Sequence, residues 1–566
     1  MLMATPLAAL AELCERLEST NARNSMVSWV ASFIHQLEAK EIGASVLILM
    51  GRVLPDYDQR VLEVSWRTIS RIILKTANKN ARSFTQAFSK TGDVGEATKM
   101  VLQDGKTGHQ STLFRKKLTI LEAYRTFEEI SNIKGTGSRS KKERLLETLL
   151  GSATPEEAKY IVKALMGEMR LGFQEGLMEQ AVAEAFSLPL ELVQTASMLT
   201  GDISEVAVIA KKQGKKGLSK INLAIFRPIK PMMAQVASNI AEVFQKHGEK
   251  AAFEYKLDGA RIQIHKSGSE VKIFSRRLTN VTDSLPEVVE LVRSQVGTAT
   301  AVLEGEVIAV NENGTPMLFQ HLMRRFRRTR RIKETAEKIP IKLYLFDVMF
   351  VNGENLLTKS YSIRRKRLAK VAGEILLTKQ IIADNVETGE KFLKEASEAG
   401  HEGVMAKKLD SYYTPGIRGK KWLKVKTTLE PLDLIIVAAE YGYGRRHGWL
   451  SNYLLAARDA ETGELVPLGK TFKGLTDDEI IKMTRELKRL TLGKEGHRIL
   501  VKPKIVVEVA YNEIQRSPKY KGGMALRFAR ITRIRQDKDP EDADTIERVT
   551  KIYERQFEKK ARYNDS

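Results

Sequence analysis

The chain has 566 residues, of which 42% are hydrophobic and 29% are charged, and its 93 lysines and arginines exceed its 70 acidic residues by 23. This composition is typical of a soluble globular protein, and the length allows three or four domains of roughly 150 residues each. The excess of positive charge and the pI near 9.7 favour a polyanionic partner, above all nucleic acid, over a merely basic cytosolic protein.

The composition also argues against several classes of protein. Cys14 is the only cysteine, so neither an internal disulfide nor a Cys-x-x-Cys metal site can form, which favours an intracellular compartment. No apolar run approaches the roughly 18 residues of a membrane span. Glu12, Glu15 and Glu18 interrupt the first 20 residues, which therefore do not resemble a signal peptide. We expect a monomer in the cytoplasm, associated with the nucleoid and without membrane contact.

Residues 1–222 are predicted to be helical, because apolar residues recur there at spacings of three and four. Thr154–Glu157 has the composition of a helix start, with a capping hydroxyl, then a proline, then two acids at the positive end of the helix dipole. Two stretches rich in lysine and glycine, Lys134–Lys142 and Lys211–Gly217, interrupt the helical pattern. They could hold a phosphate backbone or form ordinary solvated loops.

The hydrophobic period changes after Phe226–Pro231, whose two prolines mark a boundary. Alternating apolar and polar residues on both sides of Ser267-Gly268 predict a β-hairpin. The other expected elements are strands over Ala301–Val310, Ile341–Val351 and Trp422–Lys426 and a helix over Pro286–Ser294. Residues 223–428 are therefore predicted to be a mixed domain of helices and strands.

Residues 429–566 are predicted to form a small β-domain with a C-terminal helix. Thr476–Glu479 is a capping box that opens one helix, and Asp544–Lys560 is predicted to be a second, highly charged helix. The expected strands are Leu434–Ala439, Tyr453–Ala457 and Ile505–Tyr511. Short strands with one helix among them suit an OB-fold barrel, which is a common nucleic-acid scaffold.

Lys256, in the run Phe253–Arg261, is the candidate nucleophile. An amine attacks phosphorus only when it is neutral, so a site that uses Lys256 must lower the pKa of this side chain. Lys424 and Lys426 lie two residues apart on an expected strand and therefore face the same side. If that side faces Lys256, the two cations would lower its pKa and bind the phosphate that it attacks. Otherwise they form a solvated strand face.

Carboxylates and an aromatic ring complete the candidate site. Displacement at phosphorus requires a divalent cation to neutralise developing charge, and carboxylates are its usual ligands. Glu306 on an expected strand and Glu402 after a turn could bind Mg²⁺, with Mn²⁺ as an alternative, although single acids are more often surface residues. Phe346 taken alone is a core aromatic. In a nucleotide site its ring would stack on a purine, a contact worth roughly 1–3 kcal/mol.

The order of these elements resembles the ATP-dependent DNA ligases of the archaeal and eukaryotic replicative type, within the covalent nucleotidyltransferase superfamily. Lys256–Arg261 matches the family's Lys-x-Asp-Gly-x-Arg adenylation motif. The later motifs follow in the family's order as Phe274–Arg277, Leu303–Glu306, Leu345–Asp347, Glu402–Lys407, Trp422–Lys426 and Arg533–Lys538. Arg277 departs from the asparagine that is usual there, so only Arg276 is carried over. The helical part, including Gly167–Gly172, resembles the family's DNA-binding domain.

The resemblance implies a reaction and a role for each matching residue. Lys256 would attack the α-phosphate of ATP, release pyrophosphate and pass AMP to the 5′-phosphate of a nick, which the 3′-hydroxyl then attacks. Glu254 would contact the adenine amine and Phe346 would stack on the ring. The remaining nucleotide contacts would come from Arg261, Arg276, Glu306, Arg418, Lys424 and Lys426, and the metal ligands would be Glu306 and Glu402. The leaving pyrophosphate would be oriented by Arg533, Arg535 and Lys538.

The resemblance also implies partners and motion. The substrate would be nicked duplex DNA, gripped by the helical domain and encircled when the barrel closes. The final motif must reach ATP in the first step and leave for the second, so we expect a hinge near Thr427–Leu432. Gln110–Phe114 resembles the short sliding-clamp-binding segment of archaeal ligases, although a plain loop explains so short a match better.

Three alternatives remain open at this point. The chain could be an mRNA capping guanylyltransferase or an RNA ligase, but its large helical region and Leu526-Arg527-Phe528 favour a DNA ligase. It could be a DNA-binding protein that keeps only the fold, against which the intact Lys256 and Glu402 argue. ADP or NAD could replace ATP, although no zinc or helix-hairpin-helix element of the NAD type is evident.

Overall fold

The computed structural model describes residues 4–105, 117–326, 334, 338–416, 418–426, 429–496 and 498–556. The clamp-like segment Gln110–Phe114 and the first two residues of the expected hinge, Thr427 and Thr428, lie outside these ranges. Among the described helices, none combines the length and the apolar character needed to span a lipid bilayer.

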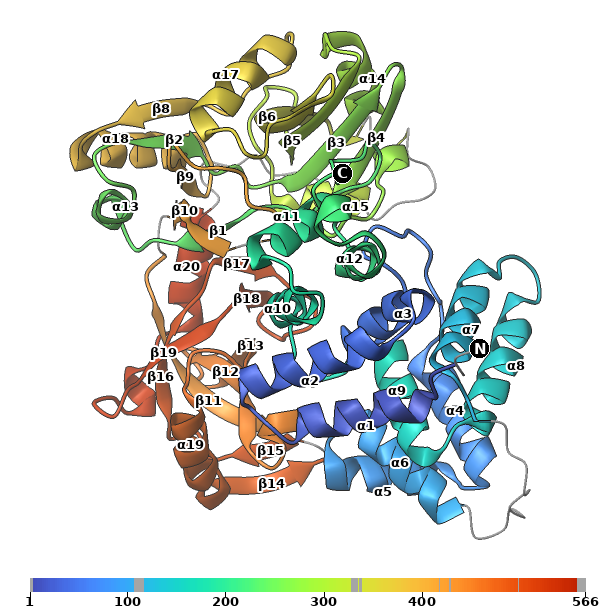
Figure 1. The fold of residues 1–566 in the computed structure, drawn as a ribbon. Coiled ribbons are helices and arrows are strands. Elements are labelled where there is room, and N and C mark those ends of the chain that lie inside the picture. Colours follow the sequence, from blue (N-terminus) through green and yellow to red (C-terminus); the bar gives the residue numbers. More distant parts are fainter. Residues whose placement is uncertain are drawn as a thin grey trace.

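The N-terminal part is helical, as predicted, and its helices share one hydrophobic core that runs from Leu7 to Leu218 (Figure 1). Its helices are α1 (Leu7–Glu18), α2 (Arg23–Gln36), α3 (Ala39–Leu49), α4 (Trp66–Ala77), α5 (Ala81–Thr91), α6 (Val94–Gly105), α7 (Ile120–Asn132), α8 (Ser138–Ser152), α9 (Pro155–Leu165), α10 (Glu175–Ala185), α11 (Leu190–Thr200) and α12 (Ile203–Leu218). The predicted start of α9 is confirmed: Glu157 N donates to Thr154 Oγ1 at 3.2 Å, and Thr154 N donates to the Glu157 carboxylate at 2.8 Å. The capping box satisfies two backbone donors that the first helical turn leaves free.

The lysine-rich stretch Lys211–Gly217 lies within α12 and interrupts it, as expected, at Gly214, which leaves the helical conformation at φ 56°. Such a φ is strained for residues with a Cβ and accessible to glycine, so the helix kinks there and continues to Leu218. The other stretch, Lys134–Lys142, does contain a turn before α8 begins at Ser138.

The middle part contains two five-stranded sheets, ordered β1-β10-β9-β2-β8 and β4-β3-β5-β6-β7. The strands are β1 (Met233–Val236), β2 (Ala251–Tyr255), β3 (Ala260–Ser267), β4 (Glu270–Ser275), β5 (Thr300–Ala309), β6 (Ile341–Val351), β7 (Glu354–Asn355), β8 (Gln380–Ala383), β9 (Gly403–Lys407) and β10 (Arg418–Lys426). Helices α13 (Ile240–His247), α14 (Pro286–Gln295), α15 (Phe319–Phe326), α17 (Tyr361–Val371) and α18 (Val386–Glu398) pack around them. The predicted hairpin is present, because Ser267 at the end of β3 pairs with Glu270 at the start of β4.

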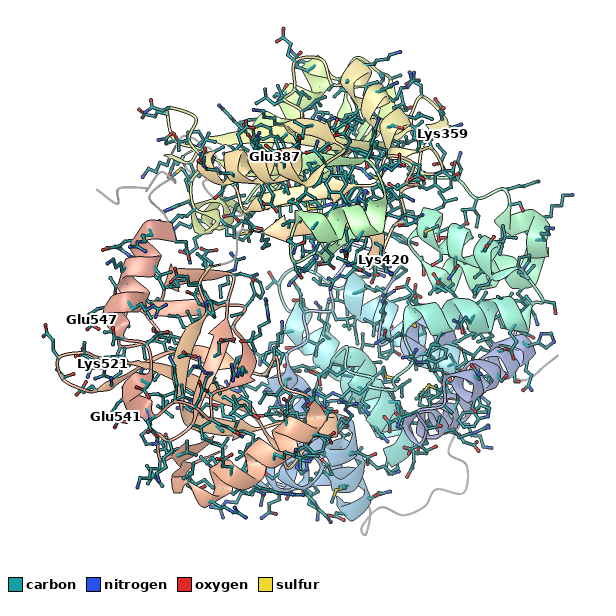
Figure 2. The ribbon with its side chains drawn as sticks, turned by 90° about the vertical axis from the view of Figure 1, so that its left-hand side faces the viewer. Lys359, Glu387, Lys420, Lys521, Glu541 and Glu547 are labelled. Carbon is teal, nitrogen blue, oxygen red and sulfur yellow. The ribbon has the colours of Figure 1, made fainter. Side chains whose placement is uncertain are left out.

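The C-terminal part, coloured orange and red in Figure 1, contains a seven-stranded sheet, a two-stranded sheet formed by β17 and β18, and two α-helices, α19 and α20. Its elements are β11 (Leu432–Tyr441), β12 (Leu450–Arg458), β13 (Leu465–Thr471), α19 (Asp477–Arg489), β14 (Thr491–Glu495), β15 (Arg498–Val501), β16 (Val506–Ala510), β17 (Glu513–Arg516), β18 (Met524–Arg527), β19 (Arg530–Ile534) and α20 (Ile546–Gln556). Strand β11 is central: its first half pairs with β16, its second half pairs with β15, and its other edge pairs with β12. Figure 2 shows that Lys521, Glu541 and Glu547 project from the outer surface of this part.

The three parts contact one another in sequence and close into a ring. The N-terminal part meets the middle part where Gln59 Nε2 donates to Leu278 O at 2.9 Å. The middle part meets the C-terminal part where Gln320 Nε2 lies 2.9 Å from Gln515 Oε1. The C-terminal part returns to the helices where Gly444 N donates to Gly92 O at 3.3 Å. The contact between the N-terminal and middle parts also includes a hydrophobic cluster that contains Leu199 and Val302, and an aromatic pair, Phe88 and Tyr443, joins the N-terminal and C-terminal parts.

Candidate active site

The backbone places Lys256 and Glu402 side by side. Lys256 follows the last residue of β2, and its N–H donates to Gly403 O at 2.8 Å, while Glu402 N donates to Lys256 O at 3.0 Å. The side chains meet as well: Lys256 Nζ lies 2.5 Å and Lys426 Nζ 2.8 Å from the same carboxylate oxygen, Glu402 Oε2. Two lysines therefore share one acidic counter-ion.

A cavity of about 680 Å³ opens beside this cluster between the two sheets of the middle part and the C-terminal part. It brings together most of the predicted site residues: Glu254, Lys256, Arg261, Arg276, Glu306, Phe346, Glu402, Arg418, Lys424 and Lys426. A cavity of this size is large enough for a nucleotide, because ligand pockets are typically about 300–1,000 Å³.

The ionisation of Lys256 differs from the expectation. Burial favours the neutral amine, but the adjacent Glu402 carboxylate outweighs it, and the pKa of Lys256 is raised. The predicted lowering applies instead to Lys424, whose pKa falls because the side chain is partly desolvated and lies near Lys256 and Lys426. The two lysines outweigh burial at Glu402 and lower its pKa to about 2. The expectation for Lys256 was wrong because it considered the neighbouring cations without the carboxylate between them.

Glu306 is the second acid of the cavity, and its pKa is shifted in the direction opposite to that of Glu402. It lies on β5 opposite Arg261 of β3. Burial raises the pKa of Glu306 to about 7, against the opposing effect of Lys256 and Arg261. A divalent cation would favour the charged carboxylate, so both Glu306 and Glu402 fit the chemistry of a metal ligand pair beside Lys256.

Arg261 is held in place by a buried acid that the motif comparison did not assign. Its guanidinium binds the Glu304 carboxylate at 2.7 and 2.8 Å and donates to Met232 O at 2.7 Å. It also lies 5.3 Å from the centre of the Phe346 ring. Glu304 is 1% exposed, so it acts as an internal support for Arg261. The Leu303–Glu306 run was recognised, but the β3–β5 register places Arg261 opposite Glu306, and only the side-chain hydrogen bonds show that Glu304 supports Arg261.

Glu254 and Phe346 lie together at the other end of the cavity. Glu254 is 1% exposed and Phe346 9%, and both line the cavity. The Phe346 ring also packs edge-on against Trp422, with ring centres 6.3 Å apart. Phe346 is thus part of a hydrophobic core and, at the same time, presents an aromatic surface to the cavity.

Lys407 is a site residue that the sequence comparison did not single out. It is 1% exposed, and its Nζ lies 2.7 Å from Glu254 Oε2 and 3.1 Å from Phe346 O. Burial lowers the pKa of Lys407, although Glu254 opposes the change. The residue ends the Glu402–Lys407 motif, but a lysine at the end of a strand gives no sign in sequence that it is buried.

The C-terminal part presents a different set of cations to the cavity from the predicted one. The cavity is lined by the cations Lys473, Arg527 and Arg530 and by the aromatic residue Phe528. It is not lined by Arg533, Arg535 or Lys538. Two of the predicted residues are bound to Asp433, at the start of β11: Arg535 Nη1 lies 2.9 Å and Lys538 Nζ 2.8 Å from the Asp433 carboxylate. The structure therefore does not bring the final motif to the nucleotide cavity.

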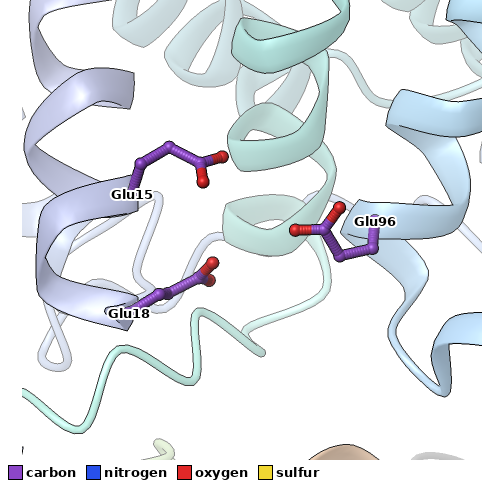
Figure 3. A group of neighbouring side chains, drawn as sticks. All are labelled: Glu15, Glu18 and Glu96. Atoms are coloured by element: carbon purple, nitrogen blue, oxygen red, sulfur yellow. The ribbon is translucent and has the colours of Figure 1, made fainter. Parts of the chain in front are cut away.

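A second acidic cluster, Glu15, Glu18 and Glu96, has a spacing that could hold a metal ion (Figure 3). Its centre is occupied by a lysine instead. Lys159 Nζ lies 2.8, 2.7 and 2.5 Å from these three carboxylates, and its side chain is fully buried. The cluster is a buried ion-pair network that joins α1, α6 and α9.

Comparison with known proteins matches almost the entire chain. Three family models match in order: "DNA ligase N terminus" over residues 6–183, "ATP dependent DNA ligase domain" over 231–426, and "ATP dependent DNA ligase C terminal region" over 446–538. The chain is 44% identical over 556 residues to a DNA ligase of Thermococcus onnurineus, covering 98% of each protein. It is 47% identical over 553 residues to DNA ligase 1 of Korarchaeum cryptofilum, covering 97% of this chain and 98% of that one.

Solved structures share the architecture. One described as Pmar-Lig_PreS3 has a TM-score of 0.57 at 18% identity and covers 93% of this chain and 99% of its own. Similarity at this level of identity concerns the fold alone.

Proposed function

This chain belongs to the ATP-dependent DNA ligases, and we propose that Lys256 is the residue on which this ligase carries AMP. One observation carries the proposal: Lys256 Nζ lies in the nucleotide-sized cavity beside two acids and two further lysines. That arrangement supplies a nucleophile, candidate ligands for a cation and positive charge for a phosphate within one site.

The proposed reaction has three steps. In the first, the neutral amine of Lys256 attacks the α-phosphorus of ATP, a P–N bond forms and pyrophosphate leaves. In the second, an oxygen of the 5′-phosphate at the nick attacks the phosphorus of AMP and the P–N bond breaks. In the third, the 3′-hydroxyl attacks the 5′-phosphorus, the backbone is joined and AMP leaves. The protein contributes mainly by positioning groups and stabilising charge, as in other phosphoryl transfers.

The chain's own residues control the protonation of Lys256. Lys424 and Lys426 add positive charge beside the amine and favour its neutral, nucleophilic form, whereas Glu402 favours the protonated form. Glu306 and Glu402 would hold Mg²⁺, or Mn²⁺ in its place, and the ion would neutralise negative charge on the reacting phosphates. Arg276 and Arg418, which also line the cavity, would bind phosphate or ribose oxygens.

The base and the pyrophosphate would be bound at opposite ends of the site. Glu254 would accept from the adenine amine while Phe346 stacks on the ring. Arg533, Arg535 and Lys538 would orient pyrophosphate only after the C-terminal part has turned, because two of them are bound to Asp433 in the observed arrangement. We place the hinge at residues 427–432, next to Asp433.

We further propose that the C-terminal sheet is an OB-fold and that domain boundaries fall near residues 222 and 428. The shared pairing of β11 with β12, β15 and β16 supports the first, because a strand that serves several partners along its length is typical of a coiled, barrel-like sheet. Nicked duplex DNA would lie in the ring, held chiefly through its phosphates, so binding should weaken as salt rises. The cellular roles proposed are replication, repair and recombination.

Covalent loading tests the assignment of Lys256. Protein freed of bound nucleotide and offered ATP with Mg²⁺ should gain the mass of one AMP, attached by an acid-labile bond. Lys256→Ala should gain none, because the proposal places the P–N bond on this amine and gives the other lysines of the cavity only binding roles. Lys272→Ala, a lysine paired with Glu270 on the β3–β4 hairpin, serves as the matched control and should load normally. An adduct of normal yield on Lys256→Ala would remove the proposal.

A further inference from the structure

The carboxylate of Glu254 is surrounded by donors, and the two oxygens are not used equally. Oε1 accepts from Tyr361 Oη, from Gln380 Nε2 at 3.3 Å and from Arg365 Nη1 at 3.5 Å. Oε2 pairs with Lys407 Nζ at 2.7 Å. A carboxylate oxygen has two acceptor directions, so among the described residues Oε2 keeps one available while Oε1 is saturated.

Glu254 borders the nucleotide-sized cavity, so the second acceptor position of Oε2 is a candidate contact for a bound base. Glu254 lines this cavity together with Phe346, and Lys407 is the only partner of Oε2 among the described contacts. In the proposed function this oxygen is the one that meets the amine at C6 of adenine. The charged and titratable groups facing Glu254 are Lys407 from β9 and Arg365 and Tyr361 from α17, with the neutral Gln380 from β8.

Lys407 also lines the cavity, but its ammonium is bound to groups of the protein. Its Nζ lies 2.7 Å from Glu254 Oε2 and 3.1 Å from Phe346 O. The Trp422 and Phe346 ring centres lie 4.5 and 4.8 Å from Nζ, so the ammonium is held by cation–π contacts as well. Because Lys407 contacts both the Glu254 carboxylate and the Phe346 ring, it can position both groups.

We propose that Lys407 is a positioning residue for base specificity, which keeps Glu254 an ionised acceptor and so selects a purine with an amine at C6 over one with a carbonyl. An acceptor-only carboxylate can bind the adenine amine, whereas the carbonyl oxygen of hypoxanthine or guanine needs a donor. The inference rests on the proposed function, in which Glu254 contacts the base of ATP. Loss of Lys407 would leave Glu254 with one distant cation, Arg365, and would favour its protonated form, which can donate.

The test compares ATP with inosine triphosphate, which differs at C6 and N1 but lacks the extra amine of guanine. Covalent loading with AMP or IMP is followed by intact mass across pH 5.5 to 8. Wild type should prefer ATP by a ratio that stays constant with pH. In Lys407→Met, which keeps the side-chain volume, the ratio should fall at least about tenfold, because a hydrogen bond to a charged group is weakened. The ratio should fall further as pH decreases, and the loss should be mainly in KM for ATP.

Three variants separate positioning from general damage. Lys407→Arg keeps the charge and should keep most of the preference for ATP. Lys266→Met is the matched control, because Lys266 is also buried in the middle part, where it donates to Thr298 O at 2.7 Å away from the cavity. Glu254→Gln should lose the preference for ATP over inosine triphosphate equally at every pH, because the glutamine amide donates a hydrogen bond at every pH. This variant also tests the inference if Lys407→Met fails to fold.

The outcomes are distinct. A wild-type ratio in Lys407→Met or Glu254→Gln at every pH would overturn the inference while leaving ATP loading intact. An equal loss of both nucleotides in Lys407→Met, without pH dependence, would reduce the residue to a structural support and would also overturn it. Absence of any adduct on wild type would instead remove the proposed function, together with everything that rests on it.

Discussion

At the scale of single residues, the site depends on charges that compete for a few shared partners. Glu402 is shared by Lys256 and Lys426, and Glu254 is shared by Lys407 and Arg365. In each case one carboxylate is the shared ion-pair partner of two cations. A substitution at one member therefore changes the others, and single-residue effects in this site will not add.

The motif order was a good guide to which residues meet and a poor guide to their ionisation. Lys256, Glu402, Lys424 and Lys426 are far apart in the chain yet line one cavity, as the resemblance implied. The direction of the pKa shift at Lys256 was wrong, because it depends on a contact of 2.5 Å that no spacing reveals. The role of Lys407 was missed for the same reason: burial and partners are properties of the folded chain.

His265 should make the middle part sensitive to acid. Phe226 N donates to His265 Nδ1 at 3.0 Å and Nε2 contacts Gln263 Oε1 at 2.9 Å, so the neutral ring ties the segment after the helical part to β3. Burial lowers the pKa of His265 to about 3. A folded pKa below the unfolded value near 6.5 stabilises the fold above pH 6.5, and this stabilisation is lost as pH falls from about 6.5 to about 3.

We expect protonation of His265 between about pH 6.5 and 3 to lower the free energy of unfolding by on the order of 4 kcal/mol, measured as the pH dependence of thermal unfolding. His265→Gln, which does not titrate, should be less stable at neutral pH and should show a smaller decrease over the same range. Parallel pH curves for the two proteins would show that this ring is not the acid-sensitive group.

At the scale of elements, strand pairing brings the functional residues together. Strand β9 lies between β2 and β10, so the residues at its ends meet Lys256 on one side and Lys426 on the other. Gly403, at the start of β9, allows the close approach: its φ is 139°, and a Cβ there would lie 2.3 Å from Val425 O. The preceding residue, Glu402, therefore depends on a glycine for its position.

Gly403→Ala should separate the start of β9 from β10 and move Glu402. We expect a loss of stability of about 2 kcal/mol from overpacking, and a larger fractional loss of AMP loading because the counter-ion of Lys256 is displaced. Denaturant unfolding and adduct yield measure the two effects. Gly297→Ala is the control, because a Cβ at Gly297 meets no atom within 4 Å. Normal loading in a destabilised Gly403→Ala would show that Glu402 keeps its place.

Elements with strong local patterns were predictable to within a residue or two. The expected strand Ile341–Val351 coincides with β6, and the capping box at Thr476–Glu479 opens α19 as predicted. The lysine-rich stretch in α12 interrupts the helix at Gly214, as expected, but the residues on both sides of the kink are helical. That continuation could not be predicted, because charge and glycine are equally typical of a loop.

At the scale of the whole molecule, the helical part touches the C-terminal part and closes the ring. His447 Nε2 lies 3.1 Å from Ser89 O, and the Phe88 and Tyr443 rings are 5.8 Å apart. The resemblance implied that the barrel closes around DNA, but the sequence did not identify the residues that meet there, because contacts such as these depend on the folded chain. The proposed domain boundaries and hinge likewise remain predictions.

Closure of the ring leads to a topological prediction. The test uses the double variant Ser89→Cys, His447→Cys, whose two cysteines are joined by a short bifunctional thiol reagent after the protein is loaded with AMP. The crosslinked protein should seal a nicked linear duplex, because a closed ring can thread onto a free DNA end. It should not seal a nicked circle, which has no free end. Crosslinking before loading should block AMP transfer from ATP, because the final motif cannot reach the cavity. The only native cysteine, Cys14, is buried with a raised thiol pKa and should not react.

The uncrosslinked double variant is the control and should seal both substrates. Gel assays on linear and circular DNA of equal length measure the difference. Equal sealing of the two by crosslinked protein would show that the duplex does not pass through the ring.

Asp433 should make the AMP-loading step of the proposed reaction harder to reverse. It binds Arg535 and Lys538, two of the three cations that would orient pyrophosphate. While the aspartate binds them, these two side chains are not available to a returning pyrophosphate, and reversal of the loading step should be disfavoured. The Asp433 carboxylate would then favour transfer of AMP to DNA over re-formation of ATP.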